Sequence, residues 1–197
     1  LVDIRFGRWD ELLNRPQPDT AQVYSNVLYH FGRGMAFSYK QNFIAAGKEL
    51  DLMREFMKDS SLNIPLAPFS AVIEAAKVAE QLLLGTIHEQ RKLFDGAIRH
   101  FQMADSIEIN MVYNEPRDWI LNPKHYLGNA YIKAGKWKEA ENTFLKDLKY
   151  NNENGWALYG LYQSLMSQNK KEAAGKVLIR FKKAFDETDV KLSGSVL

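Results

Sequence analysis

The fold is decided by residues 121–154, LNPKHYLGNAYIKAGKWKEAENTFLKDLKYNNEN. Apolar and small residues recur in this stretch every three or four positions, which predicts two short amphipathic helices. Gly128 lies on the packing face of the first helix and Ala140 on that of the second, so that the helices can approach closely. Gly135 supplies the turn between them. The stretch therefore predicts a helical hairpin.

Three positions of this hairpin recur along the chain in step. They are a first-helix residue that is small in most copies, a second-helix alanine, and a large apolar residue four positions further on. The four copies are Gly34, Ala46 and Leu50; Gly85, Ala97 and Phe101; Gly128, Ala140 and Phe144; and Tyr162, Ala174 and Leu178. Successive copies are offset by 51, 43 and 34 residues. This periodicity is typical of repeat proteins, in which each unit buries its apolar face against its neighbours.

Several further residues give the pattern a family likeness. They are Tyr113, Glu115, Pro116, Trp119, Leu127, Gly128, Glu139–Glu141, Asp147, Leu148 and Asn154–Leu158, with Arg5–Glu11 near the start of the chain. Together with the 34-residue period, they resemble the tetratricopeptide repeat (TPR), and most closely the C-terminal repeats of a bacterial group of TPR proteins. The resemblance implies a right-handed superhelix, or solenoid, of antiparallel helix pairs. It implies no reaction.

We expect one all-α domain over residues 1–197, interrupted by two irregular insertions. Trp9 lies 34 residues before Phe43, which indicates a half repeat at the start of the chain and favours further sequence upstream. The second insertion, 107–121, is expected to be a packing plug rather than a lid over a binding site. The predicted segments are a half repeat at 1–14, repeats at about 20–58, 70–106, 121–153 and 154–185, and a loose polar tail at 186–197.

Composition excludes several classes of function. The 26 Lys and Arg residues nearly balance the 24 Asp and Glu residues, so there is no basic bias that would indicate nucleic-acid binding. No apolar run approaches the length of a membrane span. The absence of cysteine excludes disulfides, thiol catalysis and zinc–thiolate sites. We expect a soluble protein without a cofactor; its compartment is left open, with the cytoplasm slightly favoured.

The four histidines and Glu89 are the candidate metal-binding or catalytic side chains. None of the histidines forms an HExxH motif or a pair four residues apart, so packed or surface positions are expected rather than metal ligands. His88 should pack between its own two helices, and His100 should be partly exposed. A compact grouping of His30, His88 or His125 with Glu89 would instead favour an enzyme site. No catalytic or metal-binding residue is predicted.

By resemblance to TPR proteins, the first helix of each repeat lines a concave groove. Asn129 and Lys133 match two positions at which one family subtype clamps a peptide carboxylate, but Gly160 and Ser167 depart from that clamp. Aromatic contact and amide hydrogen bonds are therefore expected to dominate recognition. The predicted partner-binding residues are Tyr39, Glu89, His125, Asn129, Lys133, Tyr159 and Gln163.

The first hypothesis is a non-enzymatic scaffold that binds a protein or peptide in this groove. The alternative is an accessory or regulatory C-terminal part of a larger bacterial enzyme or sensor, with the groove holding another part of the same polypeptide. An enzyme site within the solenoid ranks third. The identity of the partner and any self-association of the chain are left open.

Overall fold

The computed structural model describes residues 1–65, 68–112, 119–186 and 192–196. Within these ranges the chain forms ten α-helices and one short 3₁₀ helix, η1, and it contains no strand, only an isolated bridge between Pro65 and Ala71. The predicted all-α class is confirmed. The chain divides into two compact units, Leu1–Pro123 (unit 1) and Lys124–Leu197 (unit 2), which are described separately below.

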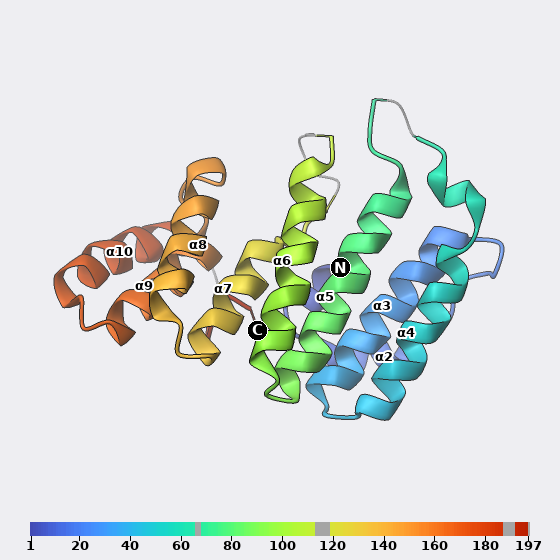
Figure 1. Ribbon diagram of the computed structural model, residues 1–197, viewed down its shortest axis with the longest axis horizontal. Coiled ribbons are helices and arrows are strands. Elements are labelled where there is room, and N and C mark those ends of the chain that lie inside the picture. The colour runs from blue at the N-terminus through green and yellow to red at the C-terminus, as the bar shows by residue number, and fades with distance from the viewer. Residues whose placement is uncertain (66–67, 113–118, 187–191, 197) are drawn as a thin grey trace. The chain divides into compact units, whose positions relative to one another are not determined.

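Unit 1 is built from two long helical hairpins preceded by two short helices. Helix α3 packs on α4 and α5 on α6, while α3 also contacts α2 and α5. Figure 1 shows these hairpins in blue to cyan and in green. The elements are α1 (Val2–Arg5), α2 (Trp9–Asn14), α3 (Val23–Tyr39), α4 (Phe43–Met57), η1 (Ser60–Asn63), α5 (Val72–Gln90) and α6 (Phe94–Asn110).

The second predicted insertion contributes to the core of unit 1. The side chain of Trp119 is 2% exposed, and its ring lies 5.7 Å from that of Phe31. Its indole N–H donates a hydrogen bond to the carbonyl of Leu121 at 2.9 Å. This end of the insertion therefore packs into unit 1, as expected for a packing plug. Tyr113 and the rest of residues 113–118 lie outside the described residues.

Unit 2 contains four helices that follow one another in space as in sequence. Helix α8 packs on α9, and α9 packs on α10. Helix α7 meets α8 where the backbone of Gly128 faces the ring of Phe144. The helices are α7 (Pro123–Lys133), α8 (Trp137–Tyr150), α9 (Gly155–Ser167) and α10 (Lys171–Ala184).

The turns inside the hairpins share one backbone geometry. Each contains a residue with left-handed φ, between 59° and 72°, at Gly7, Gln41, Lys92, Gly135 and Asn169. These residues are spaced by the offsets that the side chains predicted. The N–H that follows each of them donates to a carbonyl five residues earlier, which is the Schellman helix ending. The donor and acceptor pairs are Arg8 and Asp3, Asn42 and Phe37, Leu93 and His88, Lys136 and Tyr131, and Lys170 and Leu165. The helical-repeat architecture is thereby confirmed.

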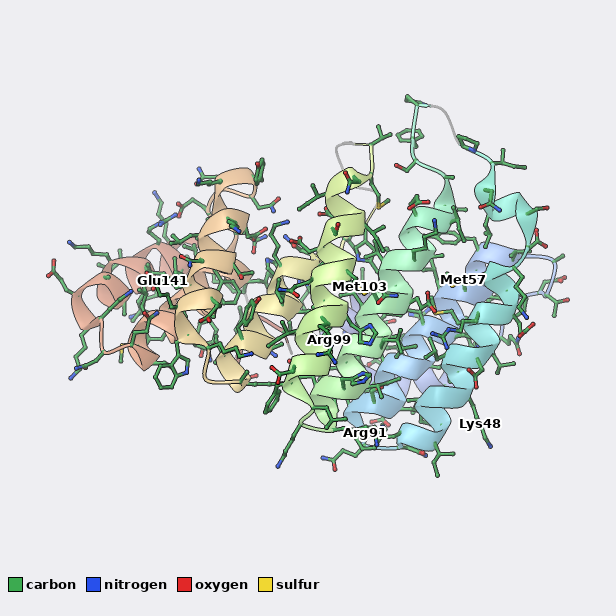
Figure 2. The ribbon with its side chains drawn as sticks, in the orientation of Figure 1. Lys48, Met57, Arg91, Arg99, Met103 and Glu141 are labelled. Carbon is green, nitrogen blue, oxygen red and sulfur yellow. The ribbon has the colours of Figure 1, made fainter. Side chains whose placement is uncertain are left out.

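Two of the second helices, α6 and α8, carry side chains at or near the surface of their unit. Arg99 and Met103, one turn apart, lie on the exposed face of α6 (Figure 2). Glu141 of α8 accepts hydrogen bonds from Gln168 at 2.8 Å and from Lys170 at 2.6 Å, and so links α8 to the turn between α9 and α10. Across the described parts of the chain, no helix is long and apolar enough to cross a membrane.

Candidate peptide-binding surface

One buried aromatic ring sets the spacing of three helices in unit 2. The Phe144 side chain of α8 is fully buried. A Cβ atom on Gly128 of α7 would lie 2.3 Å from this ring, and one on Gly160 of α9 would lie 2.2 Å from it. Real Cβ atoms do not approach so closely, so both positions need glycine where the ring lies. The first helices of two consecutive repeats therefore share a single packing residue.

A short non-helical segment, residues 192–196, contacts both of these first helices. The side-chain N–H of Gln163 on α9 donates to the carbonyl of Ser193 at 3.1 Å. The hydroxyl of Ser195 donates to the carbonyl of His125 on α7 at 3.0 Å. A Cβ atom on Gly194 would lie 3.4 Å from Oδ1 of Asn129. We call the surface formed by the His125 carbonyl, Asn129 and Gln163 the α7/α9 surface.

This finding corrects the expectation of a loose polar tail. Ser195 and Gly194 are buried, and Leu192 and Val196 are half-buried. The expectation failed because a run of small polar residues carries no helical or strand periodicity, so the sequence gives no sign that it packs. Of the predicted tail, residues 187–191 and 197 lie outside the described residues.

The α7/α9 surface contacts mostly the backbone of the segment. Gln163 binds a carbonyl that any residue would provide, and Gly194 lies close to Asn129 because it has no side chain. Within the described part of the segment, the Ser195 hydroxyl is the one side-chain group that donates a hydrogen bond to a helix. The contacts are made by neutral groups, so binding here would depend little on salt. The arrangement can hold a peptide by shape and hydrogen bonding.

Two of the predicted partner-binding residues, Asn129 and Gln163, meet at this surface. His125 contributes its carbonyl, whereas its side chain is fully buried and its Nε2 lies 3.0 Å from Oδ2 of Asp147. Lys133 is exposed at the end of α7. Tyr159 is half-buried, with its ring centroid 5.1 Å from that of Phe181 and 6.1 Å from that of Tyr162.

The remaining two predicted residues belong to unit 1. The ring of Tyr39 stacks on that of Trp9, with centroids 4.2 Å apart and an interplanar angle of 14°. Glu89 of α5 is only 5% exposed. Both side chains therefore contribute to packing within unit 1, and their role in binding a partner stays a prediction.

A buried ionic cluster links α3 to α4 in unit 1. Glu49 accepts a hydrogen bond from Arg33 at 2.7 Å and lies 2.7 Å from Nδ1 of His30, while Arg33 also donates to the Leu13 carbonyl. Burial raises the pKa of the Glu49 carboxyl, but the hydrogen bonds from His30 and Arg33 and their charges outweigh it, so the pKa lies below its usual value. The cluster connects the two helices with the end of α2.

The other histidines also contact groups within their own unit. The His88 ring faces Gly96 of α6, which confirms that it packs between its two helices, and its Nδ1 lies 2.8 Å from the Leu84 carbonyl. His100, half-buried as expected, has its Nδ1 2.8 Å from Oε1 of Gln81. Burial and the neighbouring His88 and Arg99 lower the pKa of His100. Wherever side chains are described, His, Asp and Glu do not gather in a group of three that could hold a metal ion.

Comparison with protein-family models, with curated proteins and with solved structures finds no match for this chain.

Proposed function

We propose that the chain is a non-enzymatic, tetratricopeptide-like module that binds a protein or peptide segment across its first helices. In this proposal the helix pairs form a right-handed solenoid and the α7/α9 surface belongs to its concave groove. One observation carries the proposal: residues 192–196 already contact this surface through Gln163 and the His125 carbonyl. A helix surface that holds one non-helical segment has the shape and the hydrogen-bonding groups to hold another.

The repeat register supports the solenoid part of the proposal. Five turns with the same left-handed residue and the same Schellman hydrogen bond join successive helices in the same way. In repeat proteins, hairpins of one kind stack on their neighbours into a superhelix with one concave side, and we take the hairpins of this chain to do the same. First helices line that side in TPR proteins, and Asn129 and Gln163 are both on first helices.

A second function is favoured by the same contact. Since the segment bound at the α7/α9 surface comes from the chain itself, the surface also suits an accessory domain that holds another part of its own polypeptide. The two proposals share one binding surface and differ in the source of the bound segment. Peptides supplied from outside separate them: a groove for a separate partner should bind them in the full chain, whereas an intramolecular dock should bind them only after its own segment is removed.

The test is a selection from a random peptide library displayed on phage. The baits are the chain itself and the chain ending at residue 186, each also carrying Asn129→Ala with Gln163→Ala. We expect enriched peptides whose affinity falls about ten-fold in the double variant, as expected when the Gln163 hydrogen bond and the contact with Asn129 are both lost. Asn142→Ala on α8, an exposed amide in the same unit, is the matched control and should leave affinity unchanged.

Two results would overturn the proposal. One is that neither bait enriches any peptide although both retain their helix content by circular dichroism. The other is that enriched peptides bind the Asn129→Ala, Gln163→Ala variant as tightly as the unaltered chain. Raising the salt concentration from about 0.1 M to about 1 M should change the measured affinity little, because the groups on the surface are neutral.

A further inference from the structure

Residues 192–196 form hydrogen bonds with the α7/α9 surface but do not belong to the described core cluster of unit 2. The described core cluster of this unit is formed by residues of α8, α9 and α10, among them Phe144, Leu158 and Val177, with Tyr131 and Ile132 of α7 packed against it. Residues 192–196 are not part of that cluster. Departure of the segment would leave the contacts within that cluster intact.

We propose that residues 192–196 are a resident competitor for the peptide site, and that the partner is a peptide with the same small-residue chemistry. This inference rests on the proposed function. The bound peptide would present a backbone carbonyl to Gln163, a glycine to Asn129 and a hydroxyl to the His125 carbonyl. Ser193-Gly194-Ser195 supplies these three groups in consecutive residues.

The middle position sets the specificity of this surface. A Cβ atom on Gly194 would lie 3.4 Å from Asn129 Oδ1 and 3.1 Å from the Val196 carbonyl oxygen. The Cβ alone already requires the Val196 carbonyl of the segment itself to move, whereas its distance to Asn129 is an ordinary contact, and the two methyl groups of valine would need further room at both. A peptide with a branched residue at this position would therefore bind more weakly in this conformation.

Alanine at the two serines should affect peptide binding differently. Ser195 is fully buried and donates its hydroxyl to His125, so alanine here removes a hydrogen bond. Ser193 is exposed, and its hydrogen bond with Gln163 uses its backbone carbonyl. Alanine at Ser193 keeps that carbonyl. A peptide series can therefore tell this bound arrangement from nonspecific adhesion.

A tethered segment lowers the apparent affinity of every added peptide, because a peptide can bind only during the fraction of time in which the surface is free. If it is seated about nine-tenths of the time, the apparent affinity for an added peptide falls about ten-fold. A partner must then supply enough contacts to overcome this or must be tethered nearby at a high effective concentration. The segment would thus prevent weakly binding peptides from occupying the surface.

The experiment measures fluorescence anisotropy of a labelled peptide Leu-Ser-Gly-Ser-Val, the sequence of residues 192–196. It is titrated with the full chain and with the chain ending at residue 186. We expect the shortened chain to bind about ten-fold more tightly. On the shortened chain, the peptide equivalent of Ser193→Ala should keep its affinity, Ser195→Ala should lose about three- to ten-fold, and Gly194→Val about ten-fold or more.

Three outcomes of this titration overturn the inference: no binding to a folded shortened chain, equal binding to both chains, or equal loss from Ser193→Ala and Gly194→Val in the peptide. If the shortened chain does not fold, Gly194→Val in the full chain takes its place, since it crowds only the segment. That variant should bind the unaltered peptide more tightly than the full chain does. Library peptides that depend on Gln163 but bind both chains equally would overturn the inference and leave the proposed function standing.

Discussion

The side-chain amide of Gln163 donates a hydrogen bond to the backbone carbonyl of Ser193, thirty residues later in the chain, at 3.1 Å. The donor lies on the first helix of a repeat, and the acceptor lies in a segment without regular structure. This contact defines how the surface could recognise a peptide, because a side-chain amide that binds a backbone carbonyl requires no particular residue at that position. Selectivity then depends on the neighbours of that carbonyl, Gly194 and Ser195.

Phe144 and Gly160 should be strongly coupled in stability. Gly160→Ala places a Cβ where the Phe144 ring lies, and we expect the free energy of unfolding to fall by about 1–3 kcal/mol. In a Phe144→Leu background the same change should cost less, because the smaller side chain leaves room. Urea denaturation of the two single variants and the double variant measures this coupling.

Gly175→Ala on α10 is the matched control for that change. It is also a glycine inside a helix, but a Cβ there would meet nothing within 4 Å. Alanine should therefore raise the free energy of unfolding by about 0.5–1 kcal/mol through its better helix propensity. A destabilising effect at Gly175 equal to that at Gly160 would show that close packing at Phe144 is not the cause.

The left-handed turn residues predict opposite effects at equivalent positions. Lys92 has φ 61° and Gly135 has φ 72° in the same position of two repeats. Lys92→Gly should raise the free energy of unfolding by about 0.5–1 kcal/mol, since glycine adopts this conformation without a steric penalty. Gly135→Ala should lower it by about 1 kcal/mol for the same reason. Thermal and urea unfolding of both variants test the pair, and effects of equal sign would contradict the shared geometry.

Glu49 should make stability depend on acid pH. Its pKa in the folded chain lies below the unfolded value of 4.5, so its contribution is fully present above about pH 4.5 and is lost as the pH falls through the lower folded value. Glu49→Gln should lower the free energy of unfolding by about 1.5–3 kcal/mol at neutral pH, as for hydrogen bonds to a charged group. The deficit should shrink on acidification, as followed by urea denaturation at a series of pH values.

Glu55→Gln on the same helix provides the control for this measurement. Glu55 pairs with Lys58 on the exposed surface, with its side chain 65% exposed. Surface pairs of this kind contribute little, so the change should be within about 0.5 kcal/mol at every pH. A deficit at Glu49 that does not vary with pH would contradict ionisation of its carboxyl as the source of the stability.

The sequence carries enough information for the helices and their register because the repeats constrain one another. Gly34, Gly85 and Gly128 are small where they pack against large side chains, and each hairpin turns at the same offset. The turn conformation itself could be read from the sequence at Gly135 but not at Gln41 or Lys92. Those side chains are ordinary helix formers, and the Schellman geometry of the turn overrides their preference for negative φ.

The candidate site was only partly predictable for a different physical reason. Asn129 and Gln163 could be placed on first helices by periodicity, but their ligand is a bent segment that has no periodicity. The burial of His125 did have a signal: Asp147 interrupts an apolar stripe between Phe144 and Leu148, and a charged residue in a core position needs a polar partner. Contacts between elements far apart in the sequence depend on such pairings, which spacing within one helix does not reveal.

The most direct measurement of the central claim is the nuclear magnetic resonance signal of the Gln163 side-chain amide, assigned by its loss in Gln163→Ala. It is compared between the full chain and the chain ending at residue 186, with the exposed amide of Asn142 as an internal reference. If the α7/α9 surface holds residues 192–196 in solution, the Gln163 resonance moves towards the position of a solvated amide in the shortened chain, while that of Asn142 stays in place. Identical Gln163 resonances in the two chains would contradict the account.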